Sequence, residues 1–195
     1  SGKTTLLKKI VNLEDPNITI SPSVKIGYFR QDLSILDEEK TILQNVQESS
    51  KQEESFIRTV LARLYFFRDD VYKKVAVLSG GERVKVALAK IFVSDANVLI
   101  LDEPTNFLDI NALEALESLL QEYEGTVLFV SHDRTFVKNV ATKILAIDKR
   151  EIVAFDGTYE QFMKGREGNK KKSKEDELLV LETKITDVLS RLSIE

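Results

Sequence analysis

The hydrophobic positions of the chain repeat with two different periods, which predicts helices alternating with strands. Three segments carry apolar residues at the i, i+3, i+4, i+7 spacing of a helix, namely 6–11, 84–91 and 113–120. Three other segments are short and largely apolar, as buried strands are, namely 24–29, 98–101 and 127–130. Strands that alternate with helices indicate an α/β fold with a mostly parallel sheet and helices on its faces.

Residues 32–78 interrupt this alternation with helical periodicity alone. Apolar residues between 56 and 65 follow one another at helical spacing, after Ser50 and Glu53, which have the spacing of a capping box. We therefore expect a helical subdomain, about residues 32–94, inserted into the α/β core. Before it, Pro16 and Pro22 flank residues 18–20, where we expect a short strand.

The C-terminal part of the chain changes character twice. Residues 143–148 and 151–155 read as two strands that can pair as a hairpin, and a Lys-rich stretch follows from Lys164 to Lys174. From Leu178 to Leu192 apolar residues recur at heptad spacing, which is compatible with either a coiled coil or one amphipathic helix. We expect a domain over 1–162, a basic linker over 163–177 and the start of a helix over 178–195.

Composition narrows the classes of function. The 195 residues are 43% hydrophobic and 31% charged, which suits a folded core and excludes wholesale disorder. The absence of Cys excludes disulfides, thiol catalysis and Cys-based zinc sites, and it suits a reducing compartment. No apolar run reaches the roughly 18 residues of a membrane span, so we expect no membrane insertion. The net charge of −4 argues against attraction of the whole chain to nucleic acid, although it allows a local basic patch. His132 is the one histidine, so any chemistry that needs an imidazole must use it.

The first residues match the end of a phosphate-binding loop, G-x-x-x-x-G-K-[ST]. They run Ser1-Gly2-Lys3-Thr4-Thr5 and lead into the first helix, so Gly2, Lys3, Thr4 and Thr5 are candidate nucleotide contacts. In such a loop backbone amides cradle phosphate oxygens, Lys3 neutralises the β and γ phosphates, and the Thr4 hydroxyl coordinates Mg²⁺. Because the first half of the motif lies before Ser1, we expect residues 1–195 alone not to hydrolyse ATP.

Polar residues follow three of the predicted strands. Asp102 and Glu103 come directly after 98–101, Gln31 follows 24–29, and His132 follows 127–130. The carboxyl ends of parallel strands form the edge where α/β sheets bind ligands. Asp102 is a candidate Mg²⁺ ligand and Glu103 a candidate general base for an attacking water. Gln31 is a candidate sensor of the γ-phosphate through Mg²⁺ or water, and His132 a candidate γ-phosphate contact that steadies Glu103.

A glycine-rich turn precedes the helix that carries 84–91. It reads Leu78-Ser79-Gly80-Gly81-Glu82, and two glycines allow the backbone to approach an anion closely. The helix dipole and the Ser79 hydroxyl add to such an anion site, so Ser79, Gly80, Gly81 and Glu82 are further candidate nucleotide contacts. Taken alone, the same residues also suit a helix capped by serine.

The order of these motifs is that of an ABC-type nucleotide-binding domain, which residues 1–162 resemble throughout. Residues 102–109 resemble the EPTNHLD segment of ABC-F proteins, with Phe107 where many members have His. Residues 131–134, with Phe136, and residues 155–159 are also similar to ABC-F sequences. Lys3 and Thr4 then match Walker A, Gln31 the Q-loop, 78–82 the signature, Asp102 and Glu103 Walker B, Leu108-Asp109 the D-loop, and His132 the switch.

The resemblance implies a P-loop NTPase fold and a cytoplasmic ATPase that uses ATP and Mg²⁺. ABC-F proteins carry two such domains in one chain, and this chain resembles the second. Many members bind the ribosome near the tRNA exit site and act on translation or protect against antibiotics. The alternative is the ATPase subunit of an ABC transporter. A chromosome or repair ATPase is disfavoured, because the stretch from Gln31 to Ser79 is uninterrupted. Lys164–Lys174 fits either an rRNA contact or a solvated linker.

Overall fold

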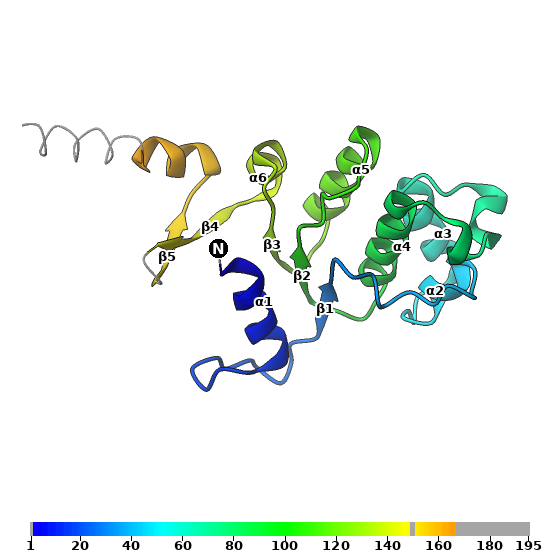
Figure 1. Cartoon of the computed structure of the whole chain (residues 1–195), viewed down its shortest axis with the longest axis horizontal. Helices are drawn as coiled ribbons and strands as arrows, with labels where there is room; N and C mark the ends of the chain where they lie inside the picture. The colour runs from blue at the N-terminus through cyan, green and yellow to red at the C-terminus, as the bar shows by residue number, and fades with distance from the viewer. Residues whose placement is uncertain (1, 149–150, 167–195) are drawn as a thin grey trace, which may run out of the picture. The chain divides into compact units, whose positions relative to one another are not determined.

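A computed structural model describes residues 2–148 and 151–166 (Figure 1). The chain divides into two compact units, one up to Val140 and one from Ala141 onward. The expected basic cluster at 170–174 and the heptad segment at 178–192 lie outside the described residues, as does Ser1.

The first unit is built on a parallel sheet of β1 (Ile26–Phe29), β2 (Val98–Asp102) and β3 (Thr126–Val130), in that order. Phe29 pairs with Leu101, and Asp102 pairs with Val130. Helix α5 (Ile110–Gln121) connects β2 to β3, and α6 (Arg134–Val140) follows β3. The predicted α/β fold with a parallel sheet is therefore confirmed, and the carboxyl ends of β1, β2 and β3 share one edge.

The two faces of the sheet are covered by different helices. Leu99 and Leu101 of β2 belong to the main apolar cluster, whereas Ile100 between them does not, because side chains alternate across a strand. Helix α1 (Lys3–Asn12) contacts β2 and buries Leu7, which also lies outside that cluster. Figure 1 shows α1 and α4 on opposite sides of the sheet.

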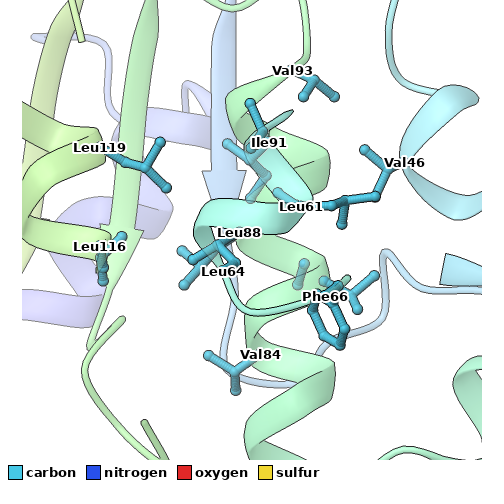
Figure 2. Packing of buried hydrophobic residues seen from close by; sticks show 14 of the residues in the cluster. Val46, Leu61, Leu64, Phe66, Val84, Leu88, Ile91, Val93, Leu116 and Leu119 are labelled. Carbon is cyan, nitrogen blue, oxygen red and sulfur yellow. The ribbon is translucent and has the colours of Figure 1, made fainter. Parts of the chain in front are cut away.

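The segment inserted between β1 and β2 is helical. It contains α2 (Ile42–Gln47), α3 (Glu54–Arg63), two 3₁₀ turns, η1 (Arg68–Tyr72) and η2 (Val75–Val77), and α4 (Gly80–Phe92). Figure 2 shows Leu61 and Leu64, at the end of α3, packed beside Leu88 of α4. The same buried cluster continues through Leu116 of α5 to the sheet, so the insertion shares one core with the α/β part.

Two local predictions are wrong. Residues 18–20 form no strand, because the amide of Ile18 donates to the carbonyl of Asp15 and closes a turn. Ser50 does not cap α3, since its hydroxyl donates to the Val93 carbonyl at 2.7 Å and Glu53 is the N-cap. Capping boxes form instead at the start of α2, between Thr41 and Gln44, and at the start of α4.

The second unit begins with the predicted hairpin. Strands β4 (Lys143–Asp148) and β5 (Glu151–Asp156) pair antiparallel, with Ile144 opposite Phe155. A helix then spans residues 159–166, started by reciprocal hydrogen bonds between Thr158 and Gln161. The expected linker start at 163 therefore falls inside a helix. Within the described ranges, none of the helices is long and apolar enough to cross a membrane.

Candidate nucleotide site

The start of α1 lies against the end of β2. The Thr4 hydroxyl donates to Asp102 Oδ1 at 3.0 Å, although the two residues are 98 positions apart. Gly2 precedes α1 with φ of 76°, a left-handed conformation that glycine adopts without strain. No side chain caps the first turn of α1, so its amides face outward at a helix N-terminus, where anions bind favourably.

These two oxygen-bearing side chains fit a magnesium ion. Mg²⁺ in nucleotide sites takes one or two carboxylates, often a hydroxyl, and phosphate oxygens and water for the rest. Asp102 is only 3% exposed, so its carboxylate is held in place beside Thr4. Its negative charge also reaches β1, where burial first and the charge of Asp102 second raise the pKa of Tyr28.

Glu103 and His132 meet at the same sheet edge. Glu103 Oε2 accepts the backbone N–H of His132 at 3.1 Å, and His132 Nε2 lies 3.1 Å from Glu103 Oε1. The backbone of Glu103 has φ of 53°, an unusual conformation for a residue with a side chain, and its N–H donates to the Val130 carbonyl. Glu103 is 7% exposed, so a nearly buried carboxylate is oriented by one residue of the neighbouring loop.

Gln31 and Lys3 are less constrained. Gln31 follows Phe29 by two positions at the carboxyl end of β1, and its side chain is exposed. In the part of the chain that the structure describes, no hydrogen bond joins Gln31 to Asp102 or Glu103. Lys3 is half-buried in the first turn of α1, and Thr5 is exposed there. The structure therefore brings together Thr4 with Asp102 and Glu103 with His132, and leaves Gln31 at the edge beside them.

The signature residues lie at a different place. Ser79 is the N-cap of α4; its N–H and hydroxyl donate to Glu82 Oε2 at 2.9 and 2.7 Å, and Glu82 N–H donates back to Ser79 Oγ. These hydrogen bonds, from the hydroxyl first, lower the pKa of Glu82. A Cβ placed on Gly81 would lie 2.6 Å from the Phe107 carbonyl oxygen, whereas one on Gly80 would meet nothing within 4 Å. Gly81 of the signature thus packs on the loop after Asp102.

Large apolar side chains are exposed just before α4, in the loop that packs on Gly81, and at the start of α5. Val77, Phe107 and Ile110 are 73%, 79% and 76% exposed, more than any other large apolar residue in the described ranges. Phe107 also has φ of 66°, a left-handed conformation that is uncommon for a residue with a side chain. We refer to these three side chains as the apolar rim of the signature. Apolar side chains this exposed are candidates for an interaction surface.

Two hydroxyl residues next to the site were assigned no role from the sequence. Thr105 Oγ1 and Ser131 Oγ lie 3.1 Å apart and join the loop after β2 to the loop after β3. Ser131 Oγ also accepts the N–H of Asp133 at 3.0 Å. The signals in the sequence are that each hydroxyl lies within two positions of Glu103 or His132, and that both lie in segments resembling ABC-F proteins.

A cavity of about 660 Å³ lies elsewhere, in the helical insertion. Its lining residues are Arg58, Ala62, Phe66, Phe67, Arg68 and Val71. None of them belongs to the predicted nucleotide site, so the cavity does not mark the place of the chemistry.

Comparisons with known proteins agree with the motif order. The family model described as ABC transporter matches residues 1–106. "ABC transporter F family member 5" of Arabidopsis thaliana is 39% identical over 83% of the chain and 24% of its own length. "Erythromycin resistance ATP-binding protein MsrA" of Staphylococcus epidermidis is 46% identical over 73% of the chain and 29% of its own length. The chain spans less than a third of the length of the curated relatives it matches.

The fold is also that of a solved ATPase domain. The dimeric ATP-binding cassette MJ0796, in a post-hydrolysis state with ADP and Pi, superposes with a TM-score of 0.62 at 21% identity. The superposition covers 80% of each chain.

Proposed function

The chain belongs to the ABC transporter family, and from this premise we propose that it binds and hydrolyses ATP as one nucleotide-binding domain of an ABC-F protein acting on the ribosome. Its resemblance to ABC-F proteins is confirmed by relatives such as ABC transporter F family member 5. The activity, the second domain and the target belong to the proposal.

The observation that carries ATP hydrolysis is the pair of contacts at the sheet edge. The hydrogen bond between Thr4 and Asp102 supports a proposed Mg²⁺ site beside the phosphates that the first turn of α1 and Lys3 would bind. Bound Mg²⁺ supplies positive charge that offsets the charge developing on the phosphates. Glu103 would orient the attacking water and accept its proton, and His132 holds the Glu103 carboxylate from both its ring and its backbone.

The position of the signature supports a partner domain. Gly81 packs on the loop of Phe107, whereas Thr4 bonds Asp102, so we propose that Ser79 and Gly81 complete a nucleotide site held by another domain. The apolar rim would then become buried against that domain. In the ABC-F arrangement the other domain is the first nucleotide-binding domain of the same chain.

The ribosome as target is supported by similarity. The segment 102–109 is of the ABC-F type, and a relative with 46% identity is named for erythromycin resistance. These features favour an ABC-F protein over the ATPase subunit of a transporter. A role in translation or in ribosome protection against antibiotics follows from this assignment.

The substitution Glu103→Gln in the full-length protein tests hydrolysis. We expect ATP turnover to fall by about 10²–10⁴, because a general base is lost, while ATP binding persists. Glu114→Gln is the matched control, since Glu114 is an exposed residue of α5. Phosphate release and binding of a fluorescent ATP analogue give the two readouts. Turnover of Glu103→Gln within threefold of wild type would exclude the proposed role.

Pelleting of ribosomes tests the target. The Glu103→Gln variant should hold ATP unhydrolysed and accumulate on ribosomes when ATP is present. The Glu114→Gln variant and nucleotide-free samples should show no such enrichment. Equal pelleting of both variants with ATP would argue against the ribosome and leave the ATPase assignment untouched.

A further inference from the structure

Thr105 and Ser131 form a hydroxyl pair that joins the loops carrying Glu103 and His132. Their oxygens lie 3.1 Å apart in a partly buried position. Ser131 Oγ accepts the N–H of Asp133, which leaves its own proton free to be donated to Thr105 Oγ1. Each loop thus has one hydroxyl that bridges to the other loop.

Besides the two contacts between His132 and the Glu103 carboxylate, the His132 loop is anchored mainly at its two ends. The His132 side chain is 76% exposed, so packing does not fix its ring. On one side of the loop, β3 ends at Val130, whose carbonyl accepts the Glu103 N–H at 2.9 Å. On the other side, the Asp133 carboxylate accepts the amides of Thr135 and Phe136 and caps α6. The segment between these anchors contains Ser131 and His132.

The loop that carries Glu103 is held by the same hydrogen bond between Thr105 and Ser131. Glu103 is held in a left-handed conformation, which costs free energy for a residue with a Cβ and persists only where neighbours determine it. Thr105 follows two positions later, in the turn in which Asn106 N–H donates to the Glu103 carbonyl. A bond from Thr105 to Ser131 therefore constrains both ends of the contact between Glu103 and His132.

We propose that Thr105 and Ser131 are positioning residues for ATP hydrolysis, acting by holding the His132 loop against the Glu103 carboxylate. The inference rests on the proposed ATPase function. The hydrogen bonds of the two hydroxyls go to each other and to Asp133, and not to Thr4 or Asp102, which would hold Mg²⁺. Loss of the pair should therefore lower the rate of hydrolysis and leave the affinity for ATP unchanged.

The test compares three substitutions in the full-length protein. Thr105→Val keeps the shape and removes the hydroxyl; we expect kcat to fall about tenfold, because small displacements of catalytic groups cost up to about 10² in rate. The KM for ATP should stay within about twofold. Thr105→Ser restores the hydroxyl and should restore kcat. Combining Thr105→Val with Ser131→Ala should lower kcat no further than Ser131→Ala alone, since Ser131→Ala already removes the bond to Thr105 together with the one from Asp133.

Thr59→Val is the matched control, because Thr59 Oγ1 also donates one hydrogen bond, to Ser55 in α3. Wild-type turnover that Glu103→Gln abolishes, measured in the same assay, tests the proposed function separately. Three results would overturn the inference: Thr105→Val with the kcat of Thr59→Val, Thr105→Ser as slow as Thr105→Val, or additive losses in the double variant. Loss of ATP binding or of the folded circular dichroism spectrum in Thr105→Val would also overturn it, by assigning the pair to folding.

Discussion

Gly80 and Gly81 are adjacent glycines at the start of α4, yet the structure predicts opposite results when each is replaced by alanine. A methyl group on Gly80 meets nothing within 4 Å. A methyl group on Gly81 lies 2.6 Å from the Phe107 carbonyl oxygen, closer than real Cβ contacts allow. The obstacle is backbone, so no side-chain rotation relieves it.

The magnitude follows from comparing the two variants. Alanine lowers the entropy lost on folding at either position, a gain of at most about 1 kcal/mol in a helix. Because both variants share this gain, their difference isolates the clash with Phe107. Overpacking in a close-packed site costs about 1–3 kcal/mol. We therefore expect Gly80→Ala to be neutral or slightly stabilising, and Gly81→Ala to be less stable than Gly80→Ala by about that amount.

Urea unfolding, followed by circular dichroism, measures the difference. In a protein of about 200 residues, each kcal/mol corresponds to about 2–4 °C in Tm, so thermal unfolding gives a second readout. Equal stability of the two variants would refute the reasoning, because it would mean that the loop of Phe107 does not rest on Gly81. A Gly80→Ala variant that is the less stable of the two would refute it more strongly.

Three further predictions concern stability. Asn45→Ala should destabilise by about 2–4 kcal/mol in urea unfolding, because Asn45 is fully buried and its side chain bonds both the N–H and the carbonyl of Asp37. Asn139→Ala, which removes only an exposed bond, should cost less than about 0.5 kcal/mol, and a similar loss in both variants would contradict this account. The pKa of Glu82 is lowered in the folded state, so ionised Glu82 should stabilise the fold fully above the ordinary glutamate pKa and cease to do so as pH falls through the folded value. The difference in free energy of unfolding between wild type and Glu82→Gln should therefore shrink in acid. A difference that is constant with pH would contradict this assignment.

The parts of the fold that depend on periodicity could be predicted from the sequence. The run 98–101 became β2, and the hydrophobic spacing from Val84 to Ile91 became the buried face of α4. Both signals repeat over several residues, so single exceptions do not hide them. The strand expected at 18–20 failed because three residues carry too little pattern, and the turn at Asp15 already uses the amide of Ile18.

The site was predictable in place but not in detail. Parallel strands bring Asp102, Glu103 and His132 to one sheet edge, and this follows from strand order alone. Which atoms meet depends on tertiary structure. The Thr4 hydroxyl reaches Asp102 only because α1 packs on β2, and no local pattern records the packing of segments 98 residues apart.

The backbone conformation of Glu103 shows why the remaining geometry escapes the sequence. A left-handed φ at a glutamate is unfavourable by about 1–2 kcal/mol, so no propensity predicts it. This conformation is supported by neighbours: the Val130 carbonyl accepts the Glu103 N–H, and the backbone N–H and ring of His132 contact the Glu103 carboxylate. The same partners that stabilise the unusual conformation orient the carboxylate for chemistry. Strain at Glu103 and orientation of Glu103 therefore share partners in the neighbouring strand and loop, which the residues beside Glu103 in the chain do not reveal.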